Sequence, residues 1–217
     1  MKDKRKILII GILSIIVVAL SSIGFYYWYQ NSYYVSTDDA YVDADFVNVT
    51  PQISGKLLEL NIEEGDTVVK NQILARQDSS SLPDSSIDKS LIRAPISGRV
   101  IKKQGTIGEI WSPGETLITL IDPDNLYITA NIKETKLGRV RIGQSVDITI
   151  DEFGSQKFTG KVKSVGEATE SAFSLLPSST SGTFTKVVKR IPVKIKLDKF
   201  NEKILPGTNA VVKIHVK

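Results

Sequence analysis

The first region set apart by hydrophobic patterning is an uncharged apolar run over residues 7–29, which follows a basic cluster at residues 2–6. At about 1.5 Å per residue, a helix of this length covers roughly 34 Å, enough to cross a hydrocarbon core of about 30 Å. We therefore predict a transmembrane helix over 7–29. The basic residues before it predict a cytoplasmic N-terminus and place the rest of the chain outside the cytoplasm.

Aromatic residues close this apolar run. Because amphipathic rings settle at membrane–water interfaces, they are candidate anchors at the outer face of the membrane. A cleaved signal peptide is the alternative, since small residues near Ala19 and Ser21 offer a possible cleavage site. The apolar stretch continues past that point, which favours an uncleaved anchor. The candidate anchors are Phe25, Tyr26, Tyr27, Trp28 and Tyr29.

Alternation of apolar and polar residues with period two begins at residue 126 and recurs over 146–151. With glycine turns between the segments, it predicts a half-buried antiparallel sheet or a small barrel. Further strands are expected over 187–197 and 210–216, and a short helix over 134–137. Residues 170–183 lack alternation and are expected to form a long loop.

The middle of the chain contains one motif twice. Ser54, Gly55, Gly65 and Leu74 recur at a constant offset of 43 residues, as Ser97, Gly98, Gly108 and Leu117. A constant offset indicates two copies of one supersecondary unit, each made of short strands separated by glycine turns. Neither copy could bury its apolar face alone, so we expect the two to pack on each other. The serine-rich segment 79–90 between them is expected to be a loop.

Composition narrows the chemistry. The chain has no cysteine, which excludes disulfides, thiolate metal sites and cysteine nucleophiles. Its net charge is +4, but residues 31–217 are nearly balanced, with 24 Lys and Arg against 23 Asp and Glu. The excess of basic residues therefore belongs to the membrane topology, and no nucleic-acid partner is predicted.

The repeat and the segments around it resemble the HlyD/EmrA-type membrane fusion proteins, the periplasmic adaptors of bacterial export pumps. The resemblance implies a mainly β fold: a split lipoyl/biotinyl-like β-sandwich (barrel-sandwich hybrid) followed by a small antiparallel β-barrel. The expected order is a cytoplasmic tail (1–6), the transmembrane helix (7–29), a linker with the first barrel strand (30–45), a lipoyl-like domain (46–122, in halves 46–78 and 90–122 joined by loop 79–90) and a β-barrel domain (123–217). The segments that carry the resemblance are 36–55, 130–151, 171–177, 185–195 and 205–214.

The resemblance also implies a function. It indicates a non-enzymatic adaptor, anchored in the inner membrane by a single span, that forms homo-oligomers and joins a transporter to the rest of an efflux path. Resemblance to EmrA-like adaptors favours a multidrug pump of the major facilitator superfamily. Related adaptors carry a long α-helical hairpin between the lipoyl halves, but residues 79–90 extend at most about 40 Å as a single strand, which puts docking to an outer-membrane channel in doubt.

Two other classes remain open. A structural or sensory envelope protein would share the anchor and the β body. A lipoyl or biotinyl carrier would modify a lysine between the two halves, where Lys89 lies, but the methionines that flank a carrier lysine are absent. A solvated surface lysine is the simpler interpretation.

Other candidate chemistry is weak, and we predict no catalytic residue, cofactor or metal. His215, the single histidine, is expected on a solvated strand face. The segment 154–161 has the wrong spacing for a phosphate loop and reads as a turn and a strand. The acids over 38–45 lack the glycine and terminal glutamate of a calcium loop. Apolar residues in the 171–177 segment are candidate partner or substrate contacts, or alternatively a plug for the barrel end: Phe173, Leu175 and Leu176.

Overall fold

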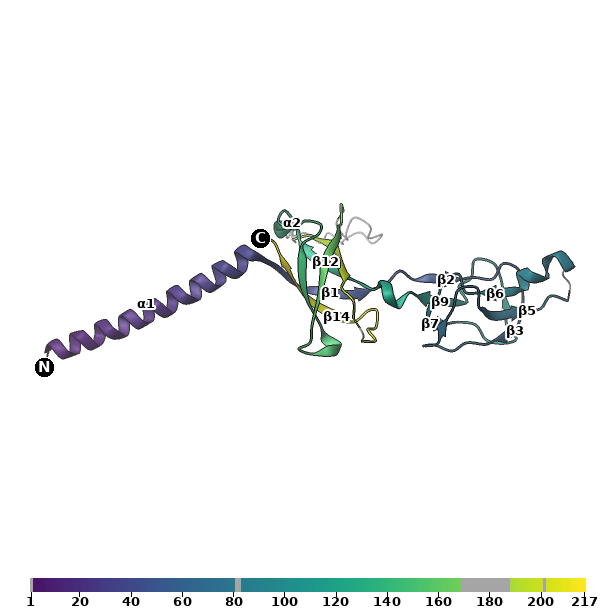
Figure 1. Ribbon diagram of the computed structural model, residues 1–217, viewed down its shortest axis with the longest axis horizontal. Coiled ribbons are helices and arrows are strands. Elements are labelled where there is room, and N and C mark those ends of the chain that lie inside the picture. The colour runs from purple at the N-terminus through teal and green to yellow at the C-terminus, as the bar shows by residue number, and fades with distance from the viewer. Residues whose placement is uncertain (1, 81–82, 169–187, 201) are drawn as a thin grey trace, which may run out of the picture. The chain divides into compact units, whose positions relative to one another are not determined.

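The computed structural model describes residues 2–80, 83–168, 188–200 and 202–217 (Figure 1). The chain forms two compact units. The first comprises Met1–Tyr41, Ile128–Asn201 and Thr208–Lys217, and the second comprises Val42–Tyr127 and Glu202–Gly207. Each unit is therefore assembled from segments far apart in the sequence.

The first unit begins with one long helix, α1 (Lys2–Tyr33). Its stretch from Leu13 to Tyr33 is long and apolar enough to cross a membrane. The linker expected at the start of 30–45 is not a separate segment, because α1 continues to Tyr33 and β1 (Tyr34–Asp43) follows directly. No glycine or proline lies between Tyr29 and the start of β1, and Tyr29 stacks on Tyr33 one turn later at a centroid distance of 4.5 Å.

The rest of the first unit is a closed six-stranded barrel, which confirms the predicted fold class. Each strand contacts two neighbours, and β14 closes the barrel by pairing antiparallel with both β1 and β11. Isoleucine and valine side chains fill the interior, among them Ile128, Ile148, Ile195 and Val212. In order around the barrel the strands are β1, β10 (Tyr127–Lys133), β13 (Arg190–Leu197), β12 (Lys157–Val165), β11 (Ser145–Ile150) and β14 (Asn209–His215).

Two short helical turns accompany the barrel. The predicted helix over 134–137 is confirmed as α2 (Glu134–Leu137), and a 3-10 turn that was not expected, η3 (Asp151–Phe153), follows β11. The segment 154–161 is confirmed as a turn that leads into β12. The loop expected over 170–183 lies outside the described residues.

One barrel strand departs from the expected half-buried pattern. β11 and most of β12 alternate between exposed and buried positions, but β10 is buried on both faces from Tyr127 to Ile132. Thr129 and Asn131, expected on a solvated face, are only 5% and 4% exposed. Asn131 is buried because polar side chains from β1 and β13 cover it.

The second unit consists of two four-stranded sheets. Its core is formed mainly by leucine and valine side chains from both copies of the repeat, including Leu57, Leu74, Val100 and Leu117. One sheet has the order β2 (Val47–Val49), β9 (Ile118–Ile121), β7 (Gly98–Lys103), β4 (Thr67–Val68). The other has the order β6 (Leu91–Arg93), β5 (Ile73–Gln77), β3 (Gly55–Leu60), β8 (Ile110–Trp111), and a 3-10 turn, η2 (Pro123–Asn125), ends the unit's second repeat.

The two copies of the repeat exchange strands. β4 of the first copy pairs with β7 of the second, and β8 of the second copy pairs with β3 of the first. The hydrogen bonds repeat at the same offset: Gly65 N–H donates to the Val100 carbonyl at 2.8 Å, and Gly108 N–H donates to the Leu57 carbonyl at 2.8 Å. Both glycines have positive φ, +95° and +98°, which other residues rarely adopt. The predicted packing of one copy on the other is confirmed.

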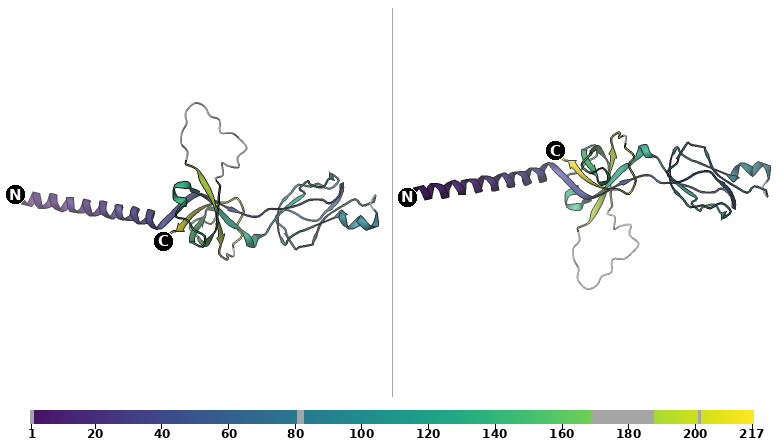
Figure 2. Two further views of the ribbon diagram at one scale, coloured as in Figure 1. Left: turned by 90° about the horizontal axis from the view of Figure 1, so that it is seen from above. Right: turned by 90° about the horizontal axis from the view of Figure 1, so that it is seen from below.

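The connector between the copies is not the loop that was expected. It contains a 3-10 helix, η1 (Asp84–Ser90), which Figure 2 shows at one end of the second unit. Pro83 precedes it in an extended conformation, which suits a helix start. The Ser90 hydroxyl donates to the Ile87 carbonyl at 2.7 Å, so a serine that suggested a loop instead closes the last turn.

Candidate functional site

The aromatic residues predicted as interface anchors occupy the last turns of α1 before the barrel. Phe25, Tyr26, Tyr27 and Trp28 are all more than half exposed, and Tyr29 is 41% exposed. Phe25 and Trp28 lie 6.0 Å apart between ring centroids. Their exposure leaves the rings available to lipid or to another membrane helix.

The end of α1 is held by the barrel. The last carbonyls of a helix have no partner within the helix. Here the Arg139 guanidinium donates to the Asn31 carbonyl at 2.6 Å and to the Ser32 carbonyl at 2.5 Å. Val216 N–H donates to the Tyr33 carbonyl at 2.9 Å. A cation at a helix C-terminus also interacts favourably with the helix dipole, so Arg139 caps α1 in two ways.

Nothing in the sequence indicated this role for Arg139. The residue follows α2, more than a hundred positions beyond the helix that it caps. Sequence reasoning looks for capping residues within a few positions of a helix end, and the last turn of α1 contains no basic residue.

The same junction contains cation–aromatic contacts. Lys213 Nζ lies 3.9 Å from the centroid of the Tyr34 ring, and the His215 ring meets Tyr34 edge to face at 4.9 Å. His215 Nε2 is 2.8 Å from Asp147 Oδ2, and both side chains are partly exposed. His215 therefore lies on the surface, where its ring contacts both the Asp147 carboxylate and the edge of Tyr34.

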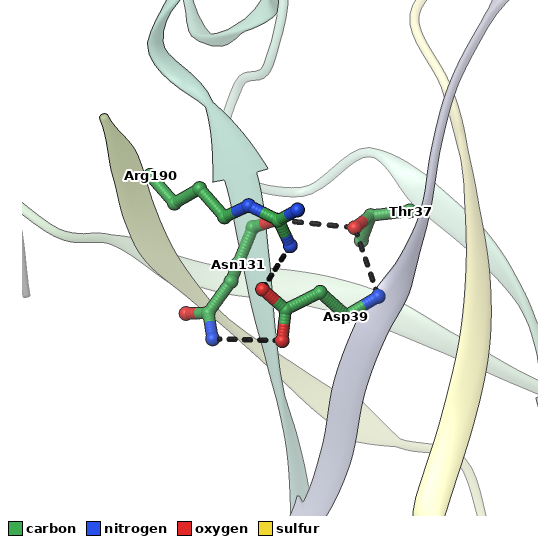
Figure 3. Close-up of polar contacts among 4 residues, drawn as sticks. All are labelled: Thr37, Asp39, Asn131 and Arg190. Carbon is green, nitrogen blue, oxygen red and sulfur yellow. Dashed lines mark hydrogen bonds and ion pairs between the residues drawn. The ribbon is translucent and has the colours of Figure 1, made fainter. Parts of the chain in front are cut away.

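A polar cluster links β1, β10 and β13 (Figure 3). The Thr37 hydroxyl donates to the Asn131 carbonyl and accepts from Asp39 N–H, each at 3.1 Å. Asp39 Oδ1 accepts from Asn131 Nδ2 at 3.2 Å, and its other oxygen pairs with Arg190. The β1–β14 register shifts between Thr37 and Ala40, within this cluster. Asn131 Oδ1 has no partner in the part of the chain that the structure describes.

This cluster is suited to holding strands together and not to catalysis. It brings together one carboxylate, one guanidinium, one amide and one hydroxyl, without a second titratable group poised to move a proton. Asp39 accepts from the buried amide nitrogen of Asn131, which would otherwise be costly to bury, and Arg190 pairs with the same carboxylate. The cluster thus fixes β10 between β1 and β13.

The acids that could have formed a calcium site have separate roles. Asp39 belongs to the cluster above, Asp43 Oδ1 accepts from Ala44 N–H at 2.9 Å, and Asp45 Oδ1 accepts from the Tyr127 hydroxyl at 3.2 Å. Among the residues that the structure describes, no group of three or more His, Asp or Glu is placed to hold a metal ion.

The connector exposes Lys89 on the last turn of η1. Before η1 in the sequence, the Asp78 carboxylate accepts from Ser80 N–H at 2.9 Å, and this hydrogen bond lowers the pKa of Asp78. The preceding residue, Gln77, is fully buried. It donates through Nε2 to the Gly55 carbonyl at 3.1 Å and to the Trp111 carbonyl at 3.0 Å. Gln77 thus ties β5, β3 and β8 together next to the connector.

The apolar residues proposed as a partner or substrate contact, Phe173, Leu175 and Leu176, lie outside the described residues. The structure therefore places none of them.

Comparison with known proteins gives matches to both units. The family model of the RND MFP barrel-sandwich hybrid domain matches residues 45–123, and that of the AAEA-like beta-barrel domain matches residues 125–215. The putative efflux system component YhbJ of Bacillus subtilis is 37% identical over 214 residues, covering 98% of this chain and 94% of that protein.

Longer relatives match over part of their length. The multidrug export protein EmrA is 37% identical in Escherichia coli, covering 63% of this chain and 33% of that protein, and 38% identical in Haemophilus influenzae, covering 60% and 35%. The chain thus aligns with about a third of each EmrA protein.

Solved structures show the same fold. That of the periplasmic adaptor protein EmrA has a TM-score of 0.58 at 15% identity, and that of the membrane fusion protein Spr0693 from Streptococcus pneumoniae R6 has 0.62 at 14%. Each comparison covers 85% of this chain and 99% of the other.

Proposed function

This chain belongs to the RND/HlyD-type membrane fusion proteins, the non-enzymatic adaptors of efflux systems, and on that premise we propose that it serves a multidrug transporter of the major facilitator type. The observation that carries the proposal is the agreement with YhbJ, named as a putative efflux system component, over nearly the whole of both chains. The EmrA relatives, named as multidrug export proteins, support the finer assignment to a multidrug pump.

In this proposal α1 anchors the protein in the inner membrane beside the transporter. The N-terminal basic cluster lies in the cytoplasm, and both β units lie outside it. The exposed face of α1 includes Gly11, Ser14 and Ser21, small residues that permit close approach of a second membrane helix. The barrel, held to the end of α1 by Arg139, then lies next to the transporter's outer surface.

The connector limits how far the adaptor can reach. η1 rises only about 14 Å, at roughly 2 Å per residue for a 3-10 helix. Direct docking to an outer-membrane channel needs a much longer element, so we propose that the protein works without contacting such a channel itself. Assembly into homo-oligomers is consistent with exposed apolar residues on the second unit, Val69, Ile107 and Ile110.

The experiment that tests this function is photocrosslinking from α1 in the native host. A photoreactive amino acid replaces Ile16 or Val18, both well exposed on the helix, and the crosslinked partner is identified by mass spectrometry. We expect a transporter of the major facilitator superfamily. A matched probe at Leu58, which is 40% exposed on β3 of the second unit, controls for random capture.

Two outcomes would contradict the proposal. Recovery of a different transporter class from α1 would refute the major facilitator assignment. Recovery of only non-transport envelope proteins would favour a structural or sensory role. The segment containing Phe173, Leu175 and Leu176 remains a proposed contact for the transporter or its substrate, to be probed by the same crosslinking at Phe173.

A further inference from the structure

The two ends of the barrel differ in charge, and the end that receives α1 is basic. The end that receives α1 is formed by the start of β1, the ends of β10 and β14 and the start of β11, which lie together because these neighbours run antiparallel. Among the described residues, the acidic ones at this end are Glu134, Glu167 and Asp147, which pairs with His215. Basic residues outnumber them, among them Lys133, Lys136, Arg139, Arg141, Lys213 and Lys217.

The opposite end is balanced in charge. Asp151 and Glu152 follow the end of β11, and Asp198 follows the end of β13. Three basic residues lie beside these three acids: Lys157, Lys196 and Lys199. The excess of positive charge is thus confined to the end that receives α1 and is lost over the length of β11, about 20 Å at roughly 3.3 Å per residue.

The basic end lies at the level of lipid headgroups when α1 spans the membrane. The headgroup layer on each side of the hydrocarbon core is about 5–7 Å thick. From Tyr29, in the aromatic belt, to Tyr33 the helix rises about 6 Å. β1 begins at the next residue, and Arg139 contacts the Asn31 and Ser32 carbonyls within that rise. The barrel therefore starts where the phosphates are.

An exposed apolar residue stands among these charges. Ile142 is 70% exposed in the turn between α2 and β11, and Gly143 after it has φ of +88°. Arg141 beside it is exposed, and its guanidinium donates to the neighbouring Val140 carbonyl. An isoleucine flanked by arginine at the membrane-facing end of a domain matches the pattern of interfacial binding, in which apolar groups enter the headgroup boundary and cations meet phosphates.

We infer that the end of the barrel that receives α1 binds anionic phospholipid headgroups, with the Ile142 turn at the lipid boundary. The inference rests on insertion of α1 but not on the identity of any transporter. An acidic surface on a partner protein could also attract these cations. Lipid is favoured because α1 brings this end to the headgroups whether or not a partner is present.

The test uses the full chain in nanodiscs without a transporter. Because the chain has no cysteine, a single fluorophore can be attached at Ile142→Cys, or at Glu152→Cys at the other end of β11 as the control. Nanodiscs contain phosphatidylcholine alone or with phosphatidylglycerol, plus a small fraction of lipid with a nitroxide on its headgroup. We expect stronger quenching at position 142 with phosphatidylglycerol, reduced by high salt, and little quenching at position 152 in either lipid.

A charge-removal variant tests which side chains are responsible. Lys133→Gln, Lys136→Gln and Arg141→Gln together should lower the docking equilibrium on the order of 100-fold, since each cation at an anionic surface contributes about fivefold. The matched control removes the same charge elsewhere on the barrel, through Lys157→Gln, Lys196→Gln and Lys199→Gln, and should retain quenching. Melting curves equal to the parent's establish that both variants are folded.

Several results would overturn the inference. These are equal quenching in the two lipids, no quenching at position 142, or equal loss in both charge-removal variants. Quenching or protection at position 142 that appears only after a transporter is added would assign the surface to a protein partner instead. None of these results bears on crosslinking of α1 to a transporter, so failure here is distinguishable from failure of the proposed function.

Discussion

Two glycines at equivalent positions of the repeat should respond oppositely to substitution by alanine. A Cβ at Gly98 would overlap the carbonyl oxygen of Ile121 and lie 3.0 Å from its carbon, on the paired strand β9. A Cβ at Gly55 would meet its nearest atoms, in Gln77 and Asp78, at 3.4 Å, an ordinary van der Waals contact. The repeat therefore supplies its own matched control.

The magnitude follows from the strand pairing. Relief of the clash at Gly98 requires β7 and β9 to separate where Arg99 faces Ile121. Overpacking costs about 1–3 kcal/mol and a lost hydrogen bond about 1 kcal/mol, so Gly98→Ala should lower the free energy of unfolding by about 2–4 kcal/mol. Gly55→Ala should raise it by about 0.4–1 kcal/mol, because alanine restricts the unfolded chain and φ at Gly55 is not positive.

The assay is thermal unfolding of the full chain in detergent, followed by the fluorescence of Trp111 in a Trp28→Phe background. Trp111 pairs with Gly55 across β3 and β8, so it reports on the second unit. At about 4–8 °C per kcal/mol for a domain of this size, Gly98→Ala should lower Tm by roughly 10–25 °C, and Gly55→Ala should raise it by a few degrees. Equal shifts for the two variants would refute the reasoning.

The remaining predictions concern the first unit and the connector. Arg139→Gln should speed hydrogen–deuterium exchange at the end of α1 in nanodiscs, and unchanged exchange would show that the capping bonds contribute nothing. Asp39→Ala should cost about 1–3 kcal/mol by leaving the buried amide of Asn131 without its acceptor, as measured by chemical denaturation. Asp38→Ala, at the exposed neighbour, should change stability by less than about 0.5 kcal/mol. Intact-mass measurement should find Lys89 unmodified, and a lipoyl or biotinyl adduct would restore the carrier hypothesis.

The repeat shows how much of the second unit the local sequence pattern could predict. Its constant offset predicted two copies of one unit, and the matched hydrogen bonds at Gly65 and Gly108 confirm it. The exchange of β4 and β8 between the copies could not be predicted. Strands of two or three residues carry too little pattern to choose a partner, and the choice depends on which pairing closes the shared core of Leu57 and Leu117.

Burial on β10 shows where the local sequence pattern fails as a predictor. Alternation predicted correctly that Ile128 and Ile132 point into the barrel, but it also predicted that Asn131 would be solvated. A period-two pattern reports only whether each residue is polar or apolar. A polar residue is nevertheless buried when a distant group forms a hydrogen bond with it. Asp39, which accepts from the Asn131 amide nitrogen, is 92 positions away in the sequence, and Arg190, which pairs with Asp39, is 59 positions from Asn131; the three meet only when the barrel closes.

The sequence by itself determined the membrane-spanning length of α1, the doubled motif of the second unit and most inward-facing barrel positions. These properties depend on residues within a few positions of one another, through helix rise, strand alternation and glycine turns. Only the tertiary structure decided that Arg139 caps α1, that the repeats exchange strands and that the cations gather where the anchor meets the barrel. Each of these depends on which distant segments become neighbours. The folding of each unit around its own core decides this, and no local pattern does.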